Sequence, residues 1–312
     1  MVWEGRWMAE GDDLFPGFAP LWIEGPAGRW FGRAGGPESA PPLLLLHGFP
    51  QSHAMWHRLA PALAQTHRVI ALDLKGYGWS AAPDSGSGEN AYAKRRLGAE
   101  IVAVMERLGH IRFALAGHDR GARIGYRLAL DEPGRIERLA LLDIVPTDVQ
   151  WARIEANPEA NPHWPFLSRP APEPETVIRR DPDGYFEGLL RDWTAAHDLT
   201  AFDARALTLY RQAWGVPERI HAMCEDYRAG GADGPDRAAD RADLAAGRTL
   251  PMPVLVLASE AYLDRDKPET ALAAWQRTFA PRAQGARIAS GHFMAEEAPE
   301  PTLRALQAFL AA

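Results

Sequence analysis

A short apolar run that ends in the pattern Gly-x-Asp-x-Gly constrains the fold of this chain more than any other segment. The run begins at Ile111 and leads into Gly117–Gly121, and apolar residues at helical spacing follow over Ala122–Leu130. Glycine has no Cβ, so a strand and a helix can cross closely at the two glycine positions. The turn between them then holds Asp119 at the start of the helix. The pattern alone leaves a second interpretation open, in which this aspartate only caps the helix.

Apolar runs of strand length alternate with segments of helical spacing on both sides of a long central region. Because alternating strands and helices build parallel sheets, this order predicts an α/β fold with a mostly parallel, twisted sheet flanked by helices. The expected strands are a hairpin at Leu21–Glu24 and Arg29–Arg33, then Pro42–Leu46, Arg68–Leu74, Arg112–Ala116, Glu137–Ile144, Met252–Ala258 and Ala286–Ala289. The expected helices are Met55–Ala64, Ala93–Leu108, Ala122–Leu130, Gly184–Ala196, Ala204–Trp214 and Pro301–Leu310.

The central region, from Pro146 to about Leu250, contains helical segments, many Trp and Pro residues and no strand-like runs. A length of 312 residues also exceeds what a single hydrophobic core usually supports. We therefore expect a core formed by residues 1–146 and 251–312 and an inserted helical cap domain formed by residues 147–250. The glycine-rich stretches Asp84–Asn90 and Gly230–Asp236 are expected to be flexible loops.

The composition argues against several classes of partner. A net charge of −7 at pH 7, without a basic run, is not the pattern of a nucleic-acid-binding protein. The apolar runs are too short to cross a bilayer, so no membrane association is expected. Met1–Phe18 lacks the apolar core of a signal peptide. Cys224 is the only cysteine, so no intrachain disulfide can form, and we expect a cytoplasmic protein.

Three polar residues follow the ends of expected strands, in the chain order Asp119, Asp143, His292. Ligands gather at the carboxyl ends of parallel strands, so these side chains are expected to lie together. The order nucleophile, acid, histidine is typical of a hydrolase triad in which Asp119 replaces the usual serine. The backbone N–H groups of Phe49 and Arg120 are expected to form an oxyanion hole beside it.

Five motifs occur along the chain: HGFP at His47–Pro50, GYGWS at Gly76–Ser80, GHDRGAR at Gly117–Arg123, LLDI at Leu141–Ile144 and GHF at Gly291–Phe293. Together they resemble the α/β-hydrolase superfamily, in the branch of dehalogenases and epoxide hydrolases that uses an aspartate nucleophile. The resemblance covers core and cap and is strongest to the fluoroacetate (haloacetate) dehalogenases. It implies an α/β-hydrolase fold and a homodimer. It also implies cleavage of small 2-haloacids, above all fluoroacetate to glycolate and fluoride, through an ester on the aspartate.

Two arginines lie in the first turn of the helix that follows Asp119. Cations are unfavourable at a helix N-terminus unless they face an anion, because the macrodipole is positive there. Asp119 is one such anion, and a substrate carboxylate held by Arg120 and Arg123 would be a second. Haloalkane dehalogenases and epoxide hydrolases commonly have Trp at the position of Arg120, so the arginine favours a carboxylate substrate. In the alternative interpretation, these arginines only pair with surface acids.

The cap is expected to bind the departing halide. Its segments Asn161–Phe166 and Asp226–Arg228 resemble the halide-binding segments of the fluoroacetate dehalogenases. Compact N–H and O–H donors replace the hydration of fluoride best. The expected donors are His163, Trp164 and Tyr227. Trp193 is a further candidate for the pocket wall, although an aromatic residue at helical spacing more often belongs to a core.

The identity of the triad acid stays open at this point. Asp143 matches the fluoroacetate dehalogenases and is preferred. Many other hydrolases place the acid after the next core strand, where Asp264 is the second candidate. Ala258–Tyr262 also departs from the Trp-Gly that is commonly found there.

Two other functions remain as alternatives. An epoxide hydrolase would share Asp119 and His292 and would protonate the epoxide with cap tyrosines; the candidates are Tyr185, Tyr210 and Tyr227. A non-catalytic carboxylate-binding protein on the same scaffold is the second alternative. No cofactor or metal is expected, because a Walker loop, a dinucleotide fingerprint and a His-Glu-x-x-His motif are all absent. The expected partners are a small haloacid and water, and the preferred halogen stays open.

Overall fold

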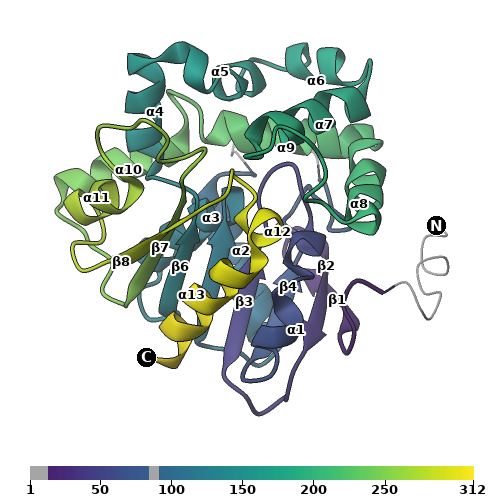
Figure 1. Cartoon of the computed structure of the whole chain (residues 1–312), viewed down its shortest axis with the longest axis vertical. Coiled ribbons are helices and arrows are strands. Elements are labelled where there is room, and N and C mark those ends of the chain that lie inside the picture. Colours follow the sequence, from purple (N-terminus) through teal and green to yellow (C-terminus); the bar gives the residue numbers. More distant parts are fainter. Residues whose placement is uncertain (1–12, 84–90) are drawn as a thin grey trace.

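Figure 1 shows the computed structural model of the chain, which describes residues 13–83 and 91–312. An eight-stranded sheet lies at the centre, in the order β1-β2-β4-β3-β5-β6-β7-β8. The strands from β3 to β8 run parallel, and β1 and β2 form an antiparallel edge. The strands are β1 (Ala19–Gly25), β2 (Gly28–Gly35), β3 (Pro42–Leu46), β4 (Arg68–Leu72), β5 (Phe113–His118), β6 (Ile136–Leu142), β7 (Val254–Ser259) and β8 (Gln284–Ile288).

The central strands are apolar because both of their faces are buried. Leu43–Leu46 of β3 are fully buried, and every residue of β5 is buried as well. Parallel strands covered on both faces are expected to consist of such continuous apolar runs. Each fully buried leucine contributes about 1.5–3 kcal/mol relative to an exposed one, so these strands form a rigid base for the residues at their ends.

Strand register brings the candidate triad residues to one edge of the sheet. His118 at the end of β5 pairs with Leu142 at the end of β6. Asp119 and Asp143 are the next residues of these adjacent strands, so they emerge side by side. His292 follows the end of the edge strand β8 by a short loop.

Helices cover the sheet, and a separate group of helices lies above the carboxyl ends of its strands (Figure 1). The covering helices are η1 (His53–Trp56), α1 (Ala60–Leu63), α2 (Lys94–Arg107), α3 (Arg120–Asp131), α11 (Ala271–Arg277), α12 (Met294–Glu297) and α13 (Pro299–Ala311). The other group lies between β6 and β7 in the chain: α4 (Thr147–Ala156), η2 (Pro158–Ala160), α5 (His163–Leu167), α6 (Glu173–Ile178), α7 (Pro182–Trp193), α8 (Ala204–Trp214), α9 (Pro217–Ala229) and α10 (Pro235–Ala245).

The predicted mostly parallel sheet with flanking helices is confirmed. The hairpin is β1 and β2, and the predicted bounds of Pro42–Leu46 and Ala204–Trp214 match β3 and α8. Within residues 147–250 the structure contains helices and turns and no strand. The division into a core of residues 1–146 and 251–312 and a cap of residues 147–250 stays a prediction.

Some predicted segments differ in the structure. Met55–Ala64 corresponds to two short helices, η1 and α1, rather than one. The predicted loop Gly230–Asp236 is a turn over residues 230–234, and its last two residues instead begin α10, which starts at Pro235. Trp151 Nε1 donates a 2.6 Å hydrogen bond to the carbonyl of Gly230 in this turn; the flexibility of the loop stays a prediction. The predicted loop at residues 84–90 and most of the predicted N-terminal segment lie outside the described residues.

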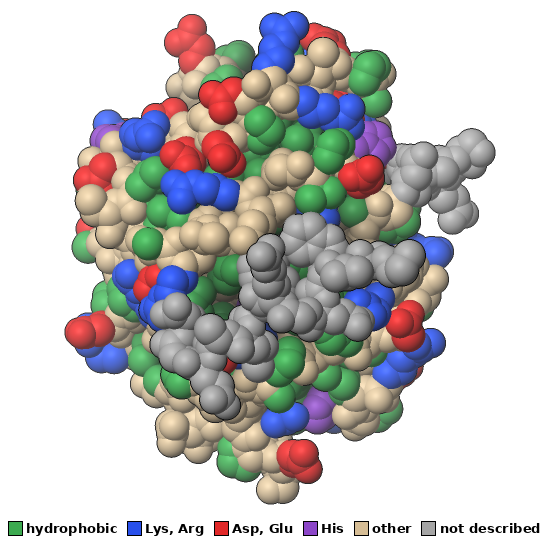
Figure 2. Space-filling model, turned by 90° about the vertical axis from the view of Figure 1, so that its right-hand side faces the viewer, with side chains coloured by type: hydrophobic (Ala, Val, Ile, Leu, Met, Phe, Trp, Pro, Cys, Tyr) green, Lys and Arg blue, Asp and Glu red, His purple; other side chains and the backbone are tan. Residues whose placement is uncertain are grey.

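The distribution of charged side chains on the surface is consistent with the net charge of −7. On the face shown in Figure 2, acidic and basic side chains of the described residues are interspersed with apolar ones. Among residues 13–83 and 91–312, none of the helices has both the length and the apolar character needed to cross a bilayer.

Candidate active site

Asp119 lies in a sharp turn between β5 and α3, with φ of 43° and ψ of −113°. The flanking glycines make this turn possible. A Cβ on Gly117 would lie 2.6 Å from the nitrogen of Ala122, and one on Gly121 would lie 2.5 Å from the carbonyl oxygen of His47. The side chain of Asp119 makes no capping hydrogen bond to α3. The elbow interpretation is therefore favoured over the simple helix cap.

His292 forms a hydrogen bond with Asp143 beside this elbow. The distance from Nδ1 of His292 to Oδ2 of Asp143 is 2.7 Å, and the other carboxylate oxygen accepts the N–H of Ser259 at 2.7 Å. Asp264 instead accepts the N–H of Ala271 at 2.7 Å, at the start of α11. The structure thus brings Asp143, and not Asp264, to the histidine.

The backbone N–H of Phe49 points at the carboxylate of Asp119. It donates to Oδ1 at 3.1 Å. This approach needs Gly48, because a Cβ there would lie 2.6 Å from the Cβ of Asp119. Arg120 is the first residue of α3, where backbone N–H groups have no partner inside the helix. The oxyanion hole stays a prediction, with one of its two N–H groups directed at the aspartate.

Opposite charges stabilise the ionised form of Asp119 and the protonated form of the neighbouring imidazole. Burial alone would raise the pKa of Asp119, but the charges of His292, Arg120 and Arg123 lower it below its ordinary value. Burial would lower the pKa of His292, but the hydrogen bond and charge of Asp143 and the charge of Asp119 raise it. An ionised carboxylate beside an imidazole that is more easily protonated than usual follows from this balance.

Arg123 lines the pocket above Asp119. Its Nη1 donates to the carbonyl of Val145 at 3.1 Å and to the hydroxyl of Thr147 at 3.2 Å. These neutral partners orient the guanidinium without neutralising it, so a buried positive charge faces the pocket. Its guanidinium also lies 4.6 Å from the ring centroid of Trp164.

Arg120 has a different environment. Its Nε donates to Oδ2 of Asp226 at 2.6 Å, and both side chains are buried. Lys94 forms a further ion pair with this aspartate. The side chain of Arg120 is not among the residues that line the pocket, although its buried Nη1 has no hydrogen-bond partner. The alternative of pairing with a surface acid is therefore wrong for Arg120, because its partner, Asp226 of α9, is buried. The role of Arg120 toward a substrate carboxylate stays a prediction.

The helices above the sheet supply the opposite wall of the same pocket, which has a volume of about 430 Å³. The three predicted halide donors and the candidate wall residue all line it: His163, Trp164, Tyr227 and Trp193. The ring centroids of His163 and Trp193 are 4.5 Å apart. Burial lowers the pKa of His163 to about 3, so its imidazole is neutral at neutral pH and offers a single N–H. Tyr185 and Tyr210 do not line the pocket.

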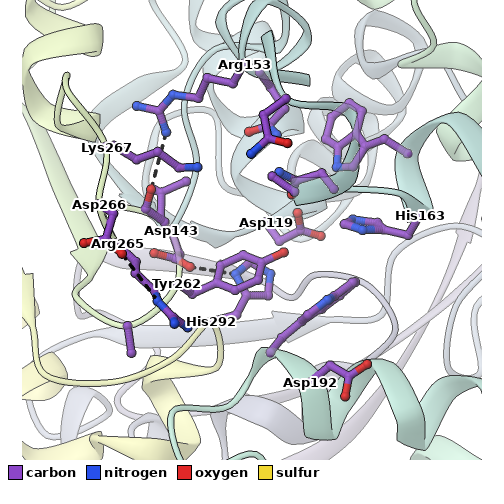
Figure 3. A pocket seen from close by; sticks show the side chains of 18 of the residues that line it. Asp119, Asp143, Arg153, His163, Asp192, Tyr262, Arg265, Asp266, Lys267 and His292 are labelled. Atoms are coloured by element: carbon purple, nitrogen blue, oxygen red, sulfur yellow. Dashed lines mark hydrogen bonds and ion pairs between the residues drawn. The ribbon is translucent and has the colours of Figure 1, made fainter. Parts of the chain in front are cut away.

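Figure 3 shows how the labelled residues surround Asp119. His163 lies on one side of the aspartate, and His292 and Tyr262 lie on the other, with Arg153 and Lys267 farther out. Sequence reasoning did not single out Tyr262 as a pocket residue, nor Gln150, Arg153, Asn157 and Lys267. The one sequence signal that pointed to Tyr262 was that the segment Ala258–Tyr262 lacks the Trp-Gly commonly found at this position in other hydrolases.

The sequence of residues 41–299 matches the family described as alpha/beta hydrolase fold. This chain belongs to the α/β-hydrolase family. The match spans the parallel strands β3 to β8 and the helices between them, so the fold and the family agree over most of the molecule.

Several α/β hydrolases are similar to this chain over most of its length. It is 43% identical to a fluoroacetate dehalogenase from a Burkholderia species over 276 residues, which cover 87% of this chain and 88% of that protein. It is 27% identical to a soluble epoxide hydrolase from a Corynebacterium species over 83% of this chain and 86% of that protein. A solved structure of a putative epoxide hydrolase from Pseudomonas aeruginosa has a TM-score of 0.87 and 41% identity, and covers 96% of this chain and 97% of that one. These similarities support a hydrolase.

Across the described parts of this α/β hydrolase, no group of three or more His, Cys, Asp or Glu side chains is arranged to hold a metal ion. The pocket instead gathers carboxylates, three histidines, guanidinium groups and aromatic donors. Such a set can bind an anion, attack a carbon atom and activate water.

Proposed function

We propose that this hydrolase cleaves the carbon–halogen bond of small 2-haloacids, with fluoroacetate as the preferred candidate, through an ester on Asp119. One observation carries the proposal. A single pocket contains an ionised aspartate, an Asp143–His292 pair joined at 2.7 Å, and a guanidinium of Arg123 that has no carboxylate partner among the described residues. The similarity to the Burkholderia fluoroacetate dehalogenase supports the same reaction.

In the first step, Asp119 attacks the carbon atom that carries the halogen. The N–H of Phe49 occupies Oδ1, which leaves Oδ2 as the attacking oxygen. Arg123 holds the substrate carboxylate, and Arg120, which does not line the pocket, adds a second positive charge near Asp119. In-line positioning of this kind contributes up to about 7–11 kcal/mol in well-oriented model reactions. The carbon–halogen bond breaks, its electron pair leaves with the halide, and an ester remains.

The departing halide is received by the donors His163, Trp164 and Tyr227. A neutral imidazole, an indole N–H and a phenol each offer one compact donor. Because His163 is neutral, it binds the halide without adding a permanent positive charge that would retain the product. Trp193 closes the pocket against these rings.

In the second step, His292 removes a proton from water, and the water oxygen attacks the ester carbonyl. The hydrogen bond that Nδ1–H of His292 donates to Asp143 orients the imidazole, and the N–H groups of Phe49 and Arg120 stabilise the developing oxyanion. The ester link then breaks and releases the 2-hydroxyacid, which restores Asp119. Formation of the ester also removes the negative charge that helped to raise the pKa of His292. The base therefore becomes easier to deprotonate when it is needed.

The test is halide release from fluoroacetate and chloroacetate by the purified protein and by its Asp119→Asn variant. We expect release by the wild type and a loss of roughly a thousandfold or more in the variant, because the nucleophile is removed. Asp183→Asn, at an exposed position of α7, is the matched control and should keep full activity. Full activity in Asp119→Asn would contradict the proposal, and release of chloride alone would count against the fluoride site.

An epoxide hydrolase is the second candidate, and a specific observation favours it. Two phenols, Tyr227 and Tyr262, line the pocket and are in a position to protonate an epoxide oxygen. The similarity to named epoxide hydrolases points the same way. Formation of a diol from styrene oxide, without halide release from either haloacid, would favour this function. Stabilisation by glycolate without any turnover would instead indicate a carboxylate-binding protein.

A further inference from the structure

Tyr262 packs directly against the base of the proposed reaction. It follows β7 by a short loop, and its ring centroid lies 4.7 Å from that of His292, at an angle of 44°. The ring centroid of Trp193 lies 5.6 Å from that of His292, at an angle of 89°, and 5.9 Å from that of Tyr262. The imidazole is thus enclosed between Tyr262 and Trp193 and hydrogen-bonded to Asp143 at Nδ1. Its remaining nitrogen, Nε2, is the one available to a water molecule.

The hydroxyl of Tyr262 is directed into the pocket. It forms no hydrogen bond within the described part of the chain, although the residue lines the pocket and is half-buried. Burial and the nearby charges of Asp143 and Asp119 raise the pKa of this phenol well above its ordinary value, so it stays a donor. In Figure 3 its oxygen points toward Asp119, from the side on which His292 lies.

The position of Tyr262 distinguishes it from the proposed halide donors. His163 lies across Asp119 from Tyr262 in Figure 3, whereas Tyr262 and His292 lie together. A halide leaves on the side opposite the attacking oxygen, but the hydrolytic water must lie between the imidazole and the ester carbonyl. The ring of Tyr262 contacts His292, and its hydroxyl points toward Asp119. The hydroxyl therefore lies in the region where this water must bind.

We propose that Tyr262 is a positioning residue for hydrolysis of the ester, with its hydroxyl bound to the water that His292 deprotonates. This inference rests on the proposed function. In this step the water oxygen bonds to the carbonyl carbon of the Asp119 ester, and its proton passes to Nε2 of His292. The bond between that carbon and the alkoxy oxygen breaks, and the departing hydroxyacid takes a proton back from the imidazolium. Tyr262 exchanges no electrons or protons and only holds the water.

The experiment is a rapid-quench single turnover with bromoacetate, in which intact-protein mass spectrometry follows the ester and bromide release is measured in parallel. Tyr262→Phe keeps the ring and removes the hydroxyl. We expect ester formation to be unchanged and ester hydrolysis to slow by about tenfold, the effect of one hydrogen bond in the transition state. At steady state kcat and KM should then fall together, which a general loss of structure would not produce.

Tyr185→Phe is the matched control, because Tyr185 is a half-buried phenol that does not line the pocket. Its ester lifetime should equal that of the wild type. An unchanged ester lifetime in Tyr262→Phe would overturn the inference, and so would slower bromide release with normal ester hydrolysis, which would make Tyr262 a substrate-binding residue. Failure of the proposed function is distinguishable, because the wild type itself would then release no bromide and form no ester.

Discussion

At the scale of single residues, the charges of Asp119 and His292 depend on each other. The pKa of His292 is raised by Asp143 and by Asp119 against the effect of burial, and the pKa of Asp119 is lowered in part by His292. Each of the two groups therefore favours the ionised form of the other. Alkylation of Asp119 would remove its negative charge and so lower the pKa of His292. This favours the neutral imidazole that the proposed ester hydrolysis requires.

Asp119→Asn should lower the pKa of His292, because the amide removes a negative charge that stabilises the imidazolium. NMR titration of the imidazole signals in the wild type and in the variant measures this shift, with the exposed control Asp183→Asn expected to leave it unchanged. Ester hydrolysis should also become faster as pH rises, because only the neutral form of the His292 imidazole can remove a proton from water. A His292 pKa that is equal or higher in Asp119→Asn would contradict this coupling.

At the scale of elements, a buried ion cluster joins the elbow to α9. Arg120 from α3 and Lys94 from α2 both pair with Asp226, and Tyr77 donates to the same carboxylate at 2.9 Å. The next residue of α9 is Tyr227, a proposed halide donor. The cluster therefore fixes the position of Tyr227 relative to the turn that holds Asp119.

Asp226→Ala should lower the free energy of unfolding by about 3–5 kcal/mol, because it leaves the buried Arg120 without its ion-pair partner and leaves Lys94 paired with Asp236 alone. Chemical denaturation measures the effect. Glu173→Ala is the matched control: it removes an exposed ion pair with Arg169 and should cost no more than about 1 kcal/mol. Equal effects of the two substitutions would show that the cluster adds nothing beyond a surface pair.

At the scale of the whole molecule, the features predicted from sequence are those with local causes. The elbow, the apolar strands and the order of Asp119, Asp143 and His292 follow from glycine spacing and continuous apolar runs. The partner of Arg120 was not predictable in this way, because Asp226 lies 106 residues away and no local pattern joins the two. Tyr262 was missed because its role depends on packing against His292.

Other properties of the molecule stay predictions. The cytoplasmic location and the homodimer follow from composition and resemblance. The pocket, about 430 Å³, falls within the roughly 300–1,000 Å³ range of ligand sites and leaves room beyond a two-carbon acid. Arg153 and Lys267 line this outer part, so an anionic substrate would meet positive charge before it reaches Arg123.

The mass of the Asp119 peptide from a His292→Asn variant tests the central claim most directly. Without its base the variant should still form the ester and fail to hydrolyse it. After incubation with chloroacetate or fluoroacetate, we expect a peptide heavier by one carboxymethyl group, carried on Asp119. An unmodified peptide from the folded variant, under conditions in which the wild type releases halide, would contradict the ester mechanism.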